Sequence, residues 1–141
     1  MTEPTLSPPV LPIDTPRALA RAIAVAALNR KAADPVVLEV GEVVGYTEFF
    51  VLVSASNPRQ VRAIAEGVKS DLKAQHGLIS VGTEGMESAK WVLVDFDDVV
   101  LHVFHEGTRS FYDLETLWAD APRPDLDLPA PQRAPQPVFE D

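Results

Sequence analysis

Residues 91–105, "WVLVDFDDVVLHVFH", decide the fold of this chain. Two runs of β-branched and aromatic residues flank the pair Asp97 and Asp98, and a connection of two residues is typical of a tight β-hairpin. The predicted register pairs Trp91 with Phe104 at the open end of the hairpin. Because side chains alternate along a strand, the hairpin has two different faces. The apolar face, which needs a cover of helices, carries Val92, Val94, Phe96, Val99, Leu101 and Val103, and the mixed face carries Trp91, Leu93, Asp95, Val100, His102 and Phe104.

The segments around the hairpin predict an α/β fold. One helix begins after the capping hydroxyl of Thr15, and a second runs from the cap Asn57 to Gly77. Short apolar runs predict five strands, at 36–40, 49–55, 78–82, 91–96 and 99–105. A third helix is expected to begin at Ser110 and to run through Trp118. Since helices and strands alternate only in part, we expect one mixed five-stranded sheet with flanking helices.

Proline content sets the expected domain limits. The chain has 141 residues and 13 prolines, most of them near the two ends. Proline lacks an amide donor, and the end segments have few large apolar side chains to offset the entropy of ordering. We therefore predict one folded domain over residues 14–120, with disordered tails over 1–13 and 121–141.

Composition also limits the chemistry. The chain has no cysteine, which excludes a thiolate nucleophile and zinc binding through sulfur. A net charge of −9 disfavours direct readout of nucleic acid and favours a basic protein partner. No apolar run approaches the roughly 18 residues of a membrane span. The first residues resemble neither a signal nor a transit peptide, so a cytoplasmic location is expected.

His102 is the most informative residue of the mixed face. It lies diagonal to both Asp95 and Trp91, within reach of a side-chain contact. The pair with Asp95 can be a structural one that completes a half-buried face, or it can orient a binding surface. A general base made from the same pair would also need a nucleophile or a substrate pocket, and the sequence shows neither.

The clustered aspartates raise the question of a metal site. Asp95 and Asp97 have the acid-x-acid spacing of two-metal phosphoryl-transfer enzymes. Such nucleotidyltransferases also carry a Gly-Ser pair about ten residues earlier to bind the triphosphate, and here Ser88 follows Glu87 and lies too close to the acids. Aspartate is common in turns for its backbone conformation alone. We therefore predict no metal, no cofactor and no catalytic residue.

The loop before the hairpin is a candidate docking edge. "GTEGMESAKW", residues 82–91, has two glycines but leads into a strand and lacks the Gly-Lys of a phosphate-binding loop. Its glycines can present Glu84 and Glu87 beside Trp91, an arrangement suited to a basic partner.

The ordered pattern formed by "GTEGMESAKWVLVDFDDVVLHVF" and "RSFYDLETLWADA" resembles the ribosomal silencing factor, or Iojap, family over residues 17–121. The resemblance implies a non-enzymatic translation repressor with a nucleotidyltransferase-like core that lacks the catalytic motif. It also implies binding to the large ribosomal subunit through its fourteenth ribosomal protein, which would block joining of the small subunit. Members of the family can dimerise, and an exposed sheet edge would permit a homodimer.

The resemblance places Trp91 and Tyr112 on the binding surface. With Arg109 of the same motif, the loop acids Glu84 and Glu87, and the pair Asp95 and His102, they make up the predicted partner-binding set. Two alternatives stay open: a magnesium-dependent nucleotidyltransferase-like enzyme that uses Asp95 and Asp97, and an acidic assembly chaperone for a large-subunit ribosomal protein.

Overall fold

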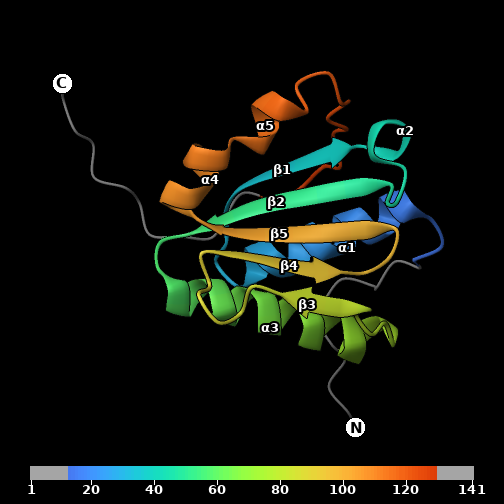
Figure 1. The fold of residues 1–141 in the computed structure, drawn as a ribbon. Coiled ribbons are helices and arrows are strands. Elements are labelled where there is room, and N and C mark those ends of the chain that lie inside the picture. The colour runs from blue at the N-terminus through green and yellow to red at the C-terminus, as the bar shows by residue number, and fades with distance from the viewer. Residues whose placement is uncertain (1–12, 130–141) are drawn as a thin grey trace, which may run out of the picture.

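Five strands and five helices make up the part of the chain that the structure, a computed structural model, describes: residues 13–129 (Figure 1). In chain order they are α1 (Pro16–Asn29), β1 (Ala33–Glu39), α2 (Gly41–Val44), β2 (Phe49–Ala55), α3 (Pro58–His76), β3 (Gly82–Glu84), β4 (Trp91–Asp95), β5 (Val99–His105), α4 (Glu106–Tyr112) and α5 (Leu114–Leu117). The strands form one sheet in the order β1-β2-β5-β4-β3, in which only β2 and β5 run parallel. The predicted mixed five-stranded α/β fold is confirmed.

The two long helices begin at the predicted caps. The Thr15 hydroxyl accepts a hydrogen bond from the amide of Ala18 at 3.0 Å, and the Asn57 side chain accepts one from the amide of Gln60 at 2.8 Å. Gly77 ends α3 with a φ of +68°, a left-handed conformation that costs glycine little. These caps fix the direction in which α1 and α3 leave the sheet.

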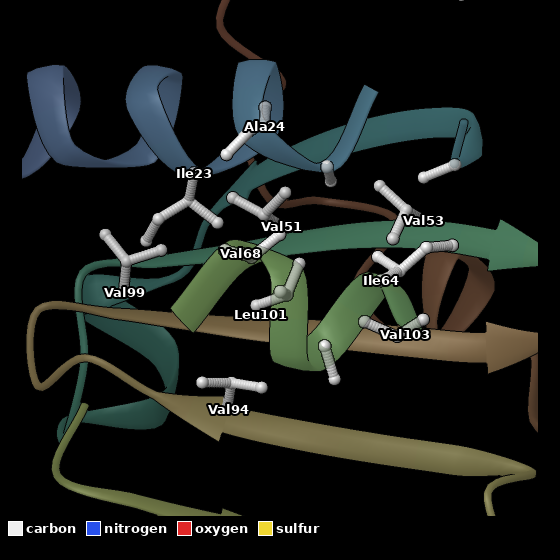
Figure 2. Close-up of a cluster of buried hydrophobic side chains, with 14 of the residues drawn as sticks. Ile23, Ala24, Val51, Val53, Ile64, Val68, Val94, Val99, Leu101 and Val103 are labelled. Atoms are coloured by element: carbon white, nitrogen blue, oxygen red, sulfur yellow. The ribbon is translucent and has the colours of Figure 1, made fainter. Parts of the chain in front are cut away.

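The main core lies between the sheet and these two helices. Figure 2 shows Ile23 of α1 next to Val51 of β2, and Ile64 of α3 next to Val103 of β5. The predicted register of the hairpin, beginning with the pair Trp91 and Phe104, is confirmed. All residues of the predicted apolar face are buried in this core.

The opposite face of the sheet is covered only in part. Its smaller buried cluster consists of Leu38, Val40, Phe50, Leu52, Val100, Phe104 and Leu114. The short helices α4 and α5 lie over one side of this face (Figure 1), and Trp118 packs on it. Because these helices are only 7 and 4 residues long, Trp91 and Leu93 remain half-buried.

The third strand differs from the prediction. β3 covers Gly82–Glu84, not 78–82, because the chain first has to turn away from the end of α3. The amide of Leu78 donates to the carbonyl of Leu72 to complete that turn, and pairing with β4 starts only at Gly82. Ile79 and Val81 are left exposed.

The predicted helix from Ser110 to Trp118 is replaced by two shorter ones. β5 runs directly into α4, so Ser110 lies inside this helix and does not cap it. Asp113 has a φ of +50°, a conformation that ends α4 and starts α5 in a new direction. The short α2 was not predicted.

Residues 122–128, which the sequence analysis assigned to the C-terminal tail, pack on the domain. Leu126 is buried in the main core, and the Arg21 guanidinium donates to its carbonyl at 2.9 Å. At the edge of the sheet the amide of Glu39 donates to the carbonyl of Pro122 at 2.8 Å. Proline lacks a donor but keeps its acceptor, so a proline-rich segment can still be tied down by donors from elsewhere.

The remaining parts of the two predicted tails, residues 1–12 and 130–141, lie outside the described residues. Between residues 13 and 129, none of the helices has both the length and the apolar content to cross a bilayer.

Candidate partner-binding face

Trp91 lies on the partly covered face, at the first position of β4. Its ring stacks on Phe104 with centroids 5.0 Å apart, and its indole N–H donates to Nδ1 of His102 at 3.1 Å. The ring is half-buried. Because the indole donor is already used, Trp91 can offer a partner apolar ring surface but no free N–H.

His102 supports this tryptophan. Burial disfavours the charged imidazolium and lowers the pKa of His102 to about 3, so the ring is neutral near pH 7. Since Nδ1 accepts from Trp91, the proton of the neutral ring resides on Nε2, and this atom has no hydrogen-bond partner within residues 13–129. The predicted pair with Asp95 is wrong, because a carboxylate oxygen of Asp95 accepts from the amide of Asp97 at 2.7 Å inside the hairpin turn.

Aromatic rings extend from Trp91 in both directions, and we call them the aromatic row. It consists of Tyr46, Phe50, His102, Trp91, Tyr112 and Phe111, with successive ring centroids 6.4, 4.6, 6.0, 4.9 and 5.0 Å apart. Phe50 and His102 are buried and Trp91 is half-buried, whereas Tyr46, Tyr112 and Phe111 are 68%, 53% and 79% exposed. Exposed large aromatic side chains of this kind mark interaction surfaces.

A shallow hollow lies at the Tyr112 end of the row. Its volume is about 510 Å³, and its lining includes Lys90, Trp91, His105, Phe111 and Tyr112. It is the place on this face where a side chain from a partner could be enclosed.

The predicted acidic loop borders the same end of the face. Glu84 and Glu87 are exposed, as expected for rim residues. Gly85 has a φ of +92°, and its backbone passes so close to β4 that a Cβ there would clash with the Trp91 carbonyl oxygen. The loop then closes through a bond from the Ala89 amide to the Gly85 carbonyl. The backbone of the loop thus runs close to that of Trp91, and both acids are exposed.

Arg109, a member of the predicted partner-binding set, is buried in this structure. The residue is 8% exposed, and its guanidinium donates four hydrogen bonds inside the protein. It makes a two-pronged ion pair with Glu115, with a shortest separation of 2.9 Å, and donates to the Asp34 carbonyl and the Ser54 hydroxyl at 2.7 and 2.8 Å. Arg109 joins α4 and α5 to the sheet, and so holds the helix that carries Tyr112.

The aspartates of the hairpin do not converge. Asp97 and Asp98 are exposed at the turn, and Asp95 accepts from the turn's own backbone. Between residues 13 and 129 no three His, Asp or Glu side chains are grouped closely enough to hold a metal ion.

Comparison with known proteins identifies the family. The family described as "Ribosomal silencing factor during starvation" matches residues 13–140. The chain belongs to this ribosomal silencing factor family. The ribosomal silencing factor RsfS of Bacillus subtilis is 38% identical over 112 residues, which cover 79% of this chain and 94% of that protein. A crystal structure of protein CV0518 from Chromobacterium violaceum is similar, with a TM-score of 0.67 and 34% identity, over 79% of this chain and 92% of that one.

A mouse relative carries a different name. "Mitochondrial assembly of ribosomal large subunit protein 1" of Mus musculus is 32% identical over 93 residues, 64% of this chain and 40% of that protein.

As a member of the ribosomal silencing factor family, this chain is a regulator of translation that associates with the ribosome, which is a regulatory class and not an enzyme class.

Two exposed aromatic residues of this silencing factor were missed from the sequence. Phe111 precedes Tyr112 in α4 and is more exposed, and Tyr46 lies at the far end of the aromatic row. An aromatic pair in a short helix was a usable signal for Phe111. The sequence carried no such signal for Tyr46, because the position of Tyr46 depends on α2, which was not predicted.

Proposed function

We propose that this silencing factor binds the large ribosomal subunit through its fourteenth ribosomal protein and sterically blocks joining of the small subunit. The observation that carries the proposal is the exposed end of the aromatic row, Tyr112 and Phe111, next to the hollow and the acidic loop. An apolar centre with a charged rim is the usual anatomy of a protein interface.

Each part of the face has a separate role in this proposal. The aromatic side chains supply most of the affinity, because a ring enclosed in an interface can contribute roughly 2–4 kcal/mol. Glu84 and Glu87 mainly raise the association rate with a basic partner and make it dependent on salt. The face contacts the ribosomal protein and does not read RNA bases directly. Binding takes place in the cytoplasm.

The experiment is sedimentation of purified subunits through a sucrose gradient with and without the protein. Wild-type protein should travel with large subunits and reduce the formation of whole ribosomes. Tyr112→Ala should weaken binding by at least about tenfold, which corresponds to roughly 1.4 kcal/mol.

Ile79→Ala is the matched control, because Ile79 is 72% exposed but precedes β3, away from α4. It should bind like the wild type. Sedimentation with small subunits, or equal effects of the two substitutions, would contradict the proposal.

A second candidate is a role as an acidic assembly chaperone for the same ribosomal protein. The name of the mouse relative, which refers to assembly of the large subunit, favours it. A chaperone should bind the free ribosomal protein much more tightly than the finished subunit, and should not inhibit joining. Titrating both under the same salt conditions separates the two functions.

A further inference from the structure

Arg62 of α3 is bonded to the loop that carries Glu87, one of the two predicted docking acids. Its Nε donates to the carbonyl of Met86 at 2.9 Å and its Nη2 donates to the carbonyl of Glu87 at 2.6 Å. The sequence suggests only a solvated helix face at Arg62, yet the side chain reaches across 24 and 25 residues of chain to make these bonds.

The two carbonyls need an outside donor because of how the loop is folded. Residues 85–89 form a single helical turn, closed by the bond from the Ala89 amide to the Gly85 carbonyl at 2.9 Å. The carbonyls at the end of such a turn have no following turn to bond with. A guanidinium carries its donors in a planar fork, which suits two neighbouring acceptors, and its positive charge suits the negative end of a helical turn.

The loop is therefore fixed from two sides. Ala89 is fully buried in the main core at one end, and Arg62 holds the middle of the loop from outside. Glu87 itself stays exposed, so the bond to its carbonyl restrains the backbone without using the carboxylate.

We infer that Arg62 is a positioning residue for partner binding, which holds the loop so that Glu87 faces a basic partner beside Trp91. The inference rests on the proposed function, since it assigns Arg62 a role in the same docking face. Without the two bonds from Arg62, Glu87 would sample many positions, and the entropy cost of ordering it on binding would lower the affinity.

The test compares Arg62→Ala with Arg59→Ala in the full chain, using purified large subunits as the probe. Both substitutions remove one positive charge from α3, but Arg59 is exposed and forms no ion pair or side-chain hydrogen bond recorded between residues 13 and 129. Arg62→Ala should weaken binding about tenfold, whereas Arg59→Ala should change it less than about twofold. Hydrogen exchange of the amides at 85–90 should accelerate only in Arg62→Ala. Equal affinities for the two variants would overturn the inference.

A double-mutant cycle separates positioning from direct contact. In a background that already carries Glu87→Ala, Arg62→Ala should have little further effect on binding, because the acid it positions is gone. A full tenfold loss in that background would overturn the inference. Arg62→Lys keeps the charge but not the fork, and it should also lose affinity, which covers the case in which Arg62→Ala folds poorly.

The outcome is distinguishable from failure of the proposed function. If Tyr112→Ala weakens binding and Arg62→Ala does not, only the role of Arg62 is wrong. If wild-type protein does not bind large subunits at all, the proposed function is wrong and the inference falls with it.

Discussion

Replacing Arg109 by methionine should destabilise the protein without removing a partner contact. Methionine keeps the length of the side chain but leaves Glu115, the Ser54 hydroxyl and the Asp34 carbonyl without the donors that Arg109 supplies. Removing one partner of a buried ion pair typically costs about 3–5 kcal/mol. The Glu115 side chain keeps 25% of its exposure, so water can recover part of the loss, and we expect a decrease of about 2–4 kcal/mol in the free energy of unfolding.

Urea denaturation and thermal melting measure this decrease. The urea midpoint should fall with little change in the m-value, and Tm should fall by roughly 8–16 °C for a domain of this size. Arg59→Met, at an exposed position of α3, should leave both unchanged. The double variant Arg109→Met with Glu115→Met should lose less than the sum of the single variants, because no charge is then left unpaired.

One result would refute the reasoning on Arg109. If Arg109→Met has the stability of the wild type but no longer binds large subunits, the guanidinium contacts the partner and the internal ion pair is not its main role.

Three further predictions follow from the packing of single residues. Leu126→Ala should cost about 2–4 kcal/mol and lower the urea midpoint, because this leucine is buried in the main core; an unchanged midpoint would mean that residues 122–128 do not pack. The pKa of His102 is about 3 in the folded protein and roughly 6.5 in the unfolded chain. Its contribution to stability is therefore complete above the unfolded-state pKa and declines as the pH falls toward the folded-state pKa. The wild type should therefore lose up to about 1.4 kcal/mol per pH unit more than His102→Leu below pH 6, as measured by urea titrations at several pH values. Gly85→Ala should lower Tm far more than Gly77→Ala, because both glycines have positive φ but only Gly85 would clash, with the Trp91 carbonyl; equal losses would argue against the close approach.

The features that could be predicted from the sequence are those set by local chemistry. The caps Thr15 and Asn57 and the left-handed Gly77 fix the ends of helices through contacts within a few residues. The hairpin register follows from a two-residue turn and from alternation, so the two faces of β4 and β5, including the place of Trp91, were correct.

The features that could not be predicted depend on contacts between distant segments. Arg109 belongs to a motif beside Tyr112, but its burial depends on Asp34 and Ser54, 75 and 55 residues away. His102 lies diagonal to Asp95 on the hairpin, but the two side chains have other partners. The Asp95 carboxylate accepts from the Asp97 amide, and Nδ1 of His102 accepts from the Trp91 indole. The C-terminal segment is ordered by donors from α1 and β1, which its own composition does not reveal.

The parallel pair in the middle of the sheet has a consequence for how the chain folds. β2 is buried at all seven of its positions, and its neighbour β5 begins 50 residues later, from Phe49 to Val99. Contacts between such distant segments form slowly, because the loop between them must be closed first. While the protein is being synthesised, the backbone N–H and C=O groups on one edge of the apolar strand β2 stay unpaired until β5 has been made. The nascent domain is therefore complete only when nearly its whole length has emerged, and until then this edge is where misfolding or aggregation of the chain would start.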